Sequence, residues 1–237
     1  TGVQTCALPI SAWDSSTGSI SIPVAILDTG VDPTHPDLAA KLVNGYNFYN
    51  NNNDWSDVCG HGTKVAGSAA AITNNAAGVA GVTWENPIIP IKITDSNCWG
   101  YYSAMSKGII HAADNGARAA NISFLIFNGA VLTDAAKYMY DKGGWVVAAG
   151  GNTGKFEDYP DNPYIISVGA TSSSDIITSF SSYGPYVDLS APGSAIYTTS
   201  NGGSYGYASG TSFSSPITAG LVSLLFSANP SLTPSQV

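Results

Sequence analysis

Short apolar runs alternate with stretches of helical periodicity along most of this chain, and that alternation limits the fold more than any other feature. The ranges predicted as strands are 22–27, 88–93, 119–123, 145–149 and 165–168. The ranges predicted as helices are 61–71, 102–115, 131–142 and a last one that begins near residue 212. Strands joined by crossover helices pair in parallel, with helices on both faces. We therefore predict an α/β fold with three layers, in which a mostly parallel sheet lies between helices.

The composition fits one globular domain and excludes several classes of protein. The chain has 237 residues, of which 44% are hydrophobic and 10% charged, so it is too apolar for a disordered protein. The net charge of −8 and a single arginine, Arg118, argue against nucleic-acid binding, which depends on basic patches. No apolar run approaches the ~20 residues of a membrane helix. We expect a monomer without a nucleic-acid or membrane partner.

The two ends of the chain look foreign to the domain. Residues 1–10 lack a clear period and resemble translated sequencing-adapter read-through, so we assign 1–11 to a non-native leader and 12–237 to the domain. Cys6 is excluded with that leader. Thr233 followed by Pro234 is typical of a helix start. We therefore expect the domain to be truncated at its C-terminus, where a helix begins.

The segment 210–216, Gly-Thr-Ser-Phe-Ser-Ser-Pro, predicts a tight turn followed by a buried helix. Gly210 permits the sharp turn. Ser212 then falls at the helix start, where unpaired N–H groups and the helix dipole favour developing negative charge. A serine at such a place is suited to act as a nucleophile. The alternative is that Ser212 only caps the helix.

Three other polar residues stand where the predicted sheet could bring them to the same edge. Asp28 ends the strand 22–27, Asn152 follows the strand 145–149, and His61 opens a helix. A serine nucleophile needs a base, and the base needs an anionic partner. The oxyanion that forms needs hydrogen-bond donors. These residue types supply such a site, although each one alone also fits an ordinary turn or helix start.

The sequence around these residues resembles the subtilisin-like serine proteases, the subtilases. The motifs similar to the family's aspartate, histidine, oxyanion-asparagine and serine motifs are 24–32, 61–67, 146–152 and 210–216, in the family's order Asp, His, Ser. The resemblance extends over roughly residues 12–237. It implies that Ser212 is the nucleophile, His61 the general base and acid, and Asp28 the group that orients His61. It also implies an oxyanion hole made by the Asn152 side chain and the Ser212 N–H.

The resemblance further implies where a substrate binds. The S1 pocket, which takes the side chain on the acyl side of the cleaved bond, would be formed by Ser123, Phe124, Leu125, Ala149, Gly150 and Gly151. An extended peptide would add as a strand along these edges. The family usually has glycines where Leu125 and Ile126 stand here, so we expect a narrower pocket or one shaped by a shifted loop. The alternative is that 124–127 is an extended core strand.

A calcium site and a disulfide are also implied by the resemblance. Calcium prefers oxygen ligands, and the family's site is matched in part by Asp37, Asn75 and Val79. The alternative is that Asp37 only caps a turn. Alignment to the family puts Cys59 and Cys98 beside the S2 subsite, so we hypothesise a disulfide between them, consistent with secretion. The alternative is two free thiols.

The function implied by the resemblance is that of a secreted serine endopeptidase, acting on protein or peptide substrates through an acyl-enzyme. A propeptide or a protein inhibitor is a further expected partner. The main alternative is a non-catalytic module of the same fold that binds peptide without cutting it. Loss of Asp28, His61 or Ser212 would mark such a module, and all three are present. An esterase could use the same chemistry, but an extended peptide groove argues against it.

Overall fold

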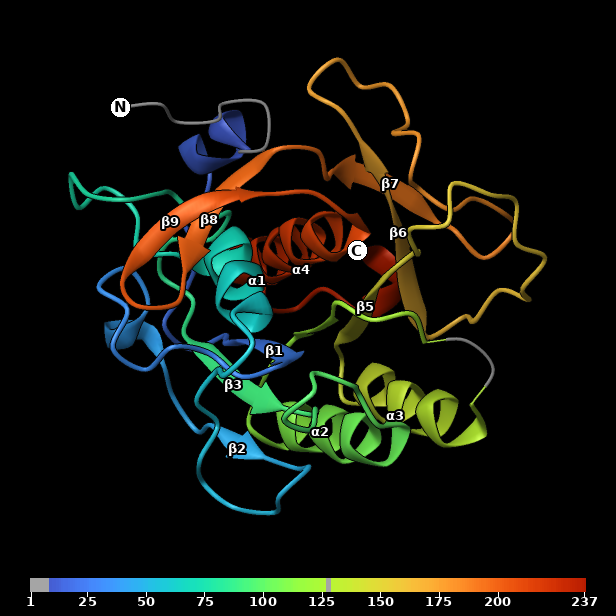
Figure 1. The fold of residues 1–237 in the computed structure, drawn as a ribbon, viewed down its shortest axis with the longest axis horizontal. Helices are drawn as coiled ribbons and strands as arrows, with labels where there is room; N and C mark the ends of the chain where they lie inside the picture. The colour runs from blue at the N-terminus through green and yellow to red at the C-terminus, as the bar shows by residue number, and fades with distance from the viewer. Residues whose placement is uncertain (1–8, 127–128) are drawn as a thin grey trace.

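The computed structural model of the protein describes residues 9–126 and 129–237. Within these residues a seven-stranded sheet has the order β2-β3-β1-β4-β5-β6-β7, and all its neighbouring strands are parallel (Figure 1). Its strands are β1 (Val24–Asp28), β2 (Tyr46–Asn47), β3 (Ile88–Lys92), β4 (Ala119–Ile122), β5 (Trp145–Ala149), β6 (Ile165–Thr171) and β7 (Leu189–Pro192). A separate antiparallel hairpin is formed by β8 (Ile196–Ser200) and β9 (Ser204–Ala208).

Helices cover both faces of this sheet, which confirms the predicted three-layer α/β fold. The helices are α1 (His61–Ala70), α2 (Tyr102–Asp114), α3 (Ala130–Asp141) and α4 (Thr211–Ala228). Helices α2 and α3 lie side by side on one face, and α1 and α4 lie on the other (Figure 1). Short 3-10 helices are Ile10–Asp14, Ala39–Lys41 and Pro234–Gln236.

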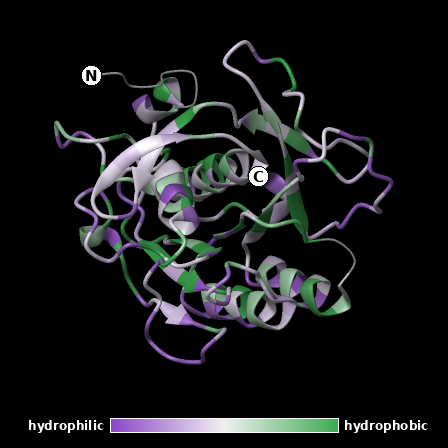
Figure 2. Ribbon diagram, viewed as in Figure 1, coloured by the Kyte–Doolittle hydropathy of each residue, from purple (hydrophilic) through white to green (hydrophobic). Residues whose placement is uncertain are grey.

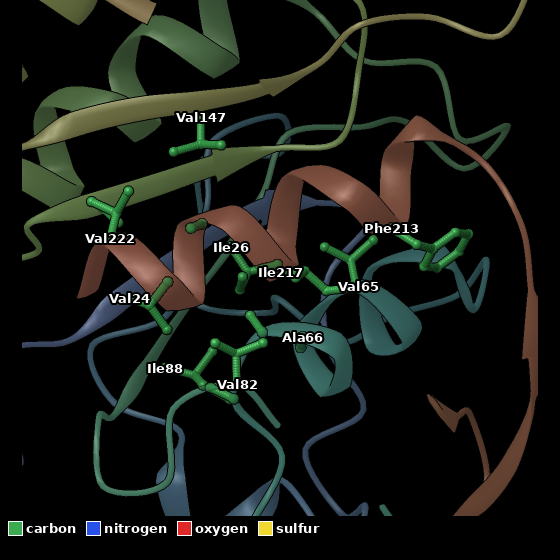
Figure 3. Packing of buried hydrophobic residues seen from close by; sticks show 14 of the residues in the cluster. Val24, Ile26, Val65, Ala66, Val82, Ile88, Val147, Phe213, Ile217 and Val222 are labelled. Atoms are coloured by element: carbon green, nitrogen blue, oxygen red, sulfur yellow. The ribbon is translucent and has the colours of Figure 1, made fainter. Parts of the chain in front are cut away.

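Successive residues of β1 face opposite layers, so the strand supplies both cores. Val24 and Ile26 pack with residues of α1 and α4, while Ala25 and Leu27 pack with residues of α2 and α3. Figure 3 shows the first of these clusters, with Ile217 of α4 beside Ile26. Every residue of β1 is fully buried, which is why all its residues except the last, Asp28, are apolar. Figure 2 shows the same separation, with hydrophobic strands and polar outer loops.

Helix α4 runs through the middle of the molecule. From the sequence we expected no segment that could cross a membrane. By length and composition alone, α4 could do so. Most of it is nevertheless buried inside the fold, between α1 and the strands of the sheet (Figure 1). Its apolar character is therefore accounted for by the core that it fills.

The two ends of the described chain pack onto the domain. Trp13 stacks edge-to-face on Trp84 at 4.8 Å, and its Nε1 donates to the Val82 carbonyl at 2.8 Å. The boundary predicted after residue 11 stays a prediction, and residues 1–8 of the expected leader, Cys6 among them, lie outside the described residues. At the other end, a capping box on Thr233 opens the 3-10 helix Pro234–Gln236, as that sequence pattern predicted.

Candidate active site

The sheet brings Asp28 and His61 into direct contact. Asp28 is the last residue of β1 and is fully buried, and His61 is the first residue of α1. Asp28 Oδ1 lies 2.7 Å from His61 Nδ1 and also accepts the Thr29 N–H at 2.7 Å. With Nδ1 donating to the carboxylate, Nε2 of His61 carries the lone pair of the neutral ring. This pair therefore has the arrangement of a general base and its orienting acid.

The charge around His61 favours its protonated form. The Asp28 carboxylate raises the pKa of His61 above its usual 6.5, against the opposing effect of burial, and the more distant Asp57 carboxylate adds to the rise. Lys64 on the same helix acts in the opposite direction. About a third of the His61 side chain remains exposed, so the ring can meet a substrate. Histidine is suited to proton transfer near neutral pH.

Ser212 is the second residue of α4. Gly210 precedes the helix with φ +149°, a backbone conformation that side chains rarely adopt, as the tight-turn prediction required. The ring of Phe213, the next residue, lies 5.8 Å from that of His61. Ser212 Oγ donates to the Ser123 carbonyl at 3.2 Å, and no hydrogen bond joins it to His61 in the described part of the chain. Hydrogen bonds between a nucleophile and its base are often long or poorly aligned in free enzymes, so this geometry does not argue against the predicted roles of the two residues.

Pro216 explains why the Ser123 hydroxyl is hydrogen-bonded to the backbone of Ser212. Proline has no N–H, so the Ser212 carbonyl lacks the helical donor four residues ahead of it. Ser123 Oγ supplies a replacement donor at 2.8 Å. Asn121 Nδ2 in turn donates to Ser123 Oγ at 2.9 Å. The end of β4 thus holds the first turn of α4 from the side of the predicted substrate-binding residues.

The Asn152 side chain is oriented by Thr211, a residue that the sequence interpretation did not single out. Asn152 Oδ1 accepts hydrogen bonds from Thr211 N at 2.9 Å and Thr211 Oγ1 at 3.1 Å. Thr211 Oγ1 also accepts the Gly151 N–H at 3.0 Å. Asn152 Nδ2 makes no hydrogen bond within the described ranges, so it is free to donate toward Ser212. The only signal for Thr211 in the sequence was its place next to the serine.

Asn152→Ala is expected to lower kcat by about 10²–10³-fold, because it removes one donor to the oxyanion and leaves the Ser212 N–H in place. The measurement is turnover of a chromogenic peptide anilide. Asn162→Ala is the control, because the Asn162 amide bonds Thr133, away from the serine. An Asn152→Ala enzyme with wild-type turnover would contradict the assigned role.

The predicted substrate-binding residues lie on both sides of Ser212. Ser123 to Leu125 follow β4, and Ala149 to Gly151 end and follow β5. A Cβ placed on Gly151 would lie 2.9 Å from Leu125 Cδ1, so the Leu125 side chain reaches across from one segment to the other. Leu125 is 40% exposed. The space between the two predicted substrate-binding segments is therefore narrowed by the Leu125 side chain, at a position where the family usually has glycine.

The alternative of a core strand over residues 124–127 is wrong for the part that the structure describes. Strand β4 ends at Ile122, and its pairing with β1 and β5 ends there too. Residues 124–126 have no strand pairing, because their backbone leaves the sheet edge after Ser123. Phe127 lies outside the described residues.

Asp37, the predicted calcium ligand, is fully buried among hydrogen-bond donors. Asn75 Nδ2 donates to its Oδ1 at 2.8 Å, and the Val79 N–H donates to its Oδ2 at 3.0 Å. The Tyr205 hydroxyl also bonds this carboxylate, and burial together with Asp37 raises the pKa of Tyr205 to about 12. A cation needs oxygen lone pairs, whereas N–H and O–H groups face the carboxylate here. In this arrangement the residues do not fit a calcium ion, and the calcium site stays a prediction.

Cys59 and Cys98 are joined by a disulfide, with a Cα–Cα distance of 6.2 Å. This is the pairing that the resemblance implied, and the alternative of two free thiols does not hold in the structure. The bond ties the loop that leads into α1 to the loop that follows β3. It therefore anchors the chain two residues before His61.

These features define a class of protein. A buried Asp paired with a partly exposed His, together with a serine at a helix start, on the carboxyl edge of a parallel sheet, is the arrangement of an α/β serine hydrolase. The profile of the subtilase family, Peptidase S8, matches residues 20–237. The chain belongs to the subtilase family of serine proteases.

Named relatives agree with that family. The chain is 45% identical over 219 residues to a thermophilic serine proteinase of Bacillus sp. (strain AK1), covering 91% of this chain and 55% of that protein. It is 42% identical over 224 residues to thermitase of Thermoactinomyces vulgaris, covering 91% of this chain and 78% of thermitase. This chain thus spans little more than half of the first of these relatives.

Solved structures give the same result. A protease from Pseudoalteromonas arctica PAMC 21717 superposes with a TM-score of 0.88 at 30% identity, over 97% of this chain and 84% of that one. A cold adapted subtilisin-like serine proteinase superposes with a TM-score of 0.81 at 32% identity, over 92% of this chain and 79% of that one. Sequence and fold therefore agree on the family.

Proposed function

We propose that this chain is the catalytic domain of a serine endopeptidase that hydrolyses peptide bonds through an acyl-enzyme. The observation that carries the proposal is the hydrogen bond between the buried Asp28 and the partly exposed His61, at the sheet edge where Ser212 and Asn152 also lie. Membership in the subtilase family and relatives named as serine proteinases support it.

In the proposed reaction, His61 Nε2 takes the proton of Ser212 Oγ as that oxygen attacks the carbonyl carbon of the peptide bond. The oxyanion accepts hydrogen bonds from Asn152 Nδ2 and the Ser212 N–H. Asp28 stabilises the imidazolium, which then gives its proton to the leaving amine. Water attacks the acyl-enzyme by the same steps, which frees Ser212 and the new carboxylic acid.

A fluorophosphonate probe tests this function directly. We expect one adduct, located on Ser212 by mass spectrometry, and its loss in His61→Ala, because the unassisted hydroxyl is a weak nucleophile. Absence of an adduct on a folded sample would favour the alternative, a module that binds peptide without cutting it. Comparing matched peptide anilides and esters then separates a peptidase from an esterase.

Leu125 supports a preference for small side chains at the acyl position, P1, of the substrate. Leu125→Gly is expected to raise kcat/KM for P1 Phe relative to P1 Ala by at least about 10-fold, because a bulky side chain leaves the proposed S1 pocket. Leu189→Gly on β7 is the matched control, since Leu189 is 41% exposed and Leu125 40%. An unchanged Phe-to-Ala ratio in Leu125→Gly would contradict this role.

Secretion, partners and calcium belong to the same proposal. The Cys59–Cys98 disulfide supports an oxidising, extracellular location. The net charge of −8 agrees with a protein or peptide substrate rather than nucleic acid. A propeptide or protein inhibitor would occupy the same cleft as substrate, and we expect a monomer. Calcium is proposed only from the family, and no step of the reaction depends on it.

A further inference from the structure

Asp57 lies in the loop that leads into α1. Its carboxylate accepts hydrogen bonds from side-chain or backbone groups of four residues. Oδ1 accepts from Thr29 Oγ1 at 2.8 Å, Cys59 N at 2.9 Å and Gly60 N at 2.8 Å. Oδ2 accepts from Thr63 N at 2.9 Å. It also lies 2.7 Å from Thr63 Oγ1, whose single proton can go either to this oxygen or to Asn201 Oδ1 at 2.5 Å. No cationic side chain forms an ion pair with this carboxylate within the described ranges. Its charge is therefore balanced by these neutral donors.

The donors belong to the two segments that carry the catalytic pair. Thr29 follows Asp28 directly, and its Oγ1 also accepts the Gly62 N–H at 2.8 Å. Thr63 lies two residues after His61, in the first turn of α1. Asp57 thus connects the end of β1 to the start of α1.

The first turn of α1 depends on this connection. Its N-cap residue is Gly60, at φ +80°, which has no side chain to cap the helix. The N–H groups of Gly62 and Thr63, which lack helical acceptors, are bound instead by Thr29 Oγ1 and Asp57 Oδ2. The position of His61 at the head of the helix is set by the same contacts.

We propose that Asp57 is a positioning residue for catalysis: it holds His61 at the start of α1 against Asp28 at the end of β1. It does not touch the reacting atoms and acts through the Thr29 and Thr63 links. This inference rests on the proposed function. The sequence offered one signal, an acidic residue just before a helix start, where carboxylates cap N–H groups.

The pH profile of activity distinguishes two roles for Asp57. A residue that acts on His61 partly through its charge changes the pH profile when that charge is removed, whereas a purely structural residue does not. The charged groups that act on His61 are Asp28 from β1, Asp57 from the preceding loop and Lys64 from α1. Only neutral His61 can accept the serine proton, so activity rises as pH passes its pKa. Asp57 favours the protonated ring. Removing its charge must therefore lower the pKa of His61 and move the acid limb of the profile to lower pH.

The test compares Asp57→Asn with Asp54→Asn. Asp54 is an exposed acid of the same loop, bonded to Ser56 and not to the first turn of α1. Asp57→Asn is expected to lower kcat by between about 10- and 100-fold with a much smaller change in KM, because small displacements of catalytic groups lower the rate of the chemical step by factors of this size. Its acid limb shifts to lower pH, while Asp54→Asn keeps the wild-type kcat and profile. Equal kcat and equal acid limbs in the two variants would overturn the proposal.

A second pair of variants keeps the proposal testable if Asp57→Asn does not fold. Thr29→Val removes one link and keeps the Asp57 charge, so kcat falls while the acid limb stays in place; Thr29→Ser keeps the hydroxyl and restores kcat. Thr29→Val with wild-type kcat would contradict the link. Where both Asp57→Asn and Thr29→Val fold, their effects on kcat should be less than additive, because both break the same connection.

Failure of this inference and failure of the proposed function give different results. A wild-type chain without peptidase activity or probe labelling would refute the function. An active wild type whose Asp57→Asn and Asp54→Asn variants behave alike would refute only the role of Asp57.

Discussion

Replacing Ser212 with alanine is expected to lower kcat for peptide hydrolysis by about 10⁶-fold, the scale on which removal of the nucleophile from such a triad acts. In the proposed reaction the Ser212 hydroxyl forms the acyl-enzyme, and the alanine side chain has no group that can replace it. The residual rate would come from the oxyanion donors and substrate binding. The measurement is kcat on a peptide anilide, with thermal unfolding recorded in parallel.

Ser209→Ala is the matched control for Ser212→Ala. Ser209 lies three residues earlier, and its hydroxyl accepts the Ala195 N–H rather than facing the catalytic pair. We expect it to retain turnover. Ser212→Ala should unfold close to the wild-type temperature, since it loses one hydrogen bond, to the Ser123 carbonyl, worth about 1 kcal/mol. A folded Ser212→Ala protein that still hydrolyses peptides at an appreciable fraction of the wild-type rate would refute the assigned nucleophile.

Asp28→Asn is expected to lower kcat by about 10⁴-fold, because the neutral amide no longer stabilises the imidazolium and favours the wrong tautomer of His61. The pKa of His61 should also fall, since the Asp28 charge is the largest cause of its rise. Asp28 Oδ2 has no hydrogen-bond partner among the described residues, so an amide nitrogen there breaks no existing bond. The measurement is kcat against pH.

Asp32→Asn distinguishes loss of the catalytic charge from loss of any buried aspartate in this segment. Asp32 is also buried, but its carboxylate accepts hydrogen bonds from Thr34 and the Gly202 N–H rather than from His61. It should lower stability without a 10⁴-fold loss of turnover. If Asp28→Asn and Asp32→Asn proved equally active, Asp28 would not be the partner of the base.

Much of the fold could be predicted because local chemistry encodes it. Residues 24–27 are apolar throughout, and together with Asp28 they form a strand buried on both faces. The turn at Gly210 and the helix after it followed from the conformational freedom of glycine and the apolar residues beyond it. Residues that end strands of a parallel sheet share one edge, so Asp28 could be expected at that edge, and the structure places it there in contact with His61 at the start of α1.

Other features depended on contacts between residues distant in the chain. Asp57 binds Thr29, 28 residues before it, and Asn152 is oriented by Thr211, 59 residues after it. The donors around Asp37 come from a loop 38 to 42 residues further on and leave the calcium ligands in an arrangement that does not fit the ion. Leu125 reaches Gly151 only because β4 and β5 are neighbours.

The sequence by itself determined helices α1 to α4, the strands β1, β3, β4, β5 and β6, the layered parallel sheet and the residue types of the candidate catalytic site, because periodicity and turn chemistry act over a few residues. It did not predict β2, β7, β8 or β9. The tertiary structure alone decided which hydrogen bonds hold that site. They are the bonds from Thr29 and Thr63 to Asp57, the bonds from Thr211 to Asn152, and the bond from Ser123 to the Ser212 carbonyl, which has no helical donor because of Pro216. Those bonds join atoms brought together by the sheet order and by loop paths. A local pattern encodes neither of these.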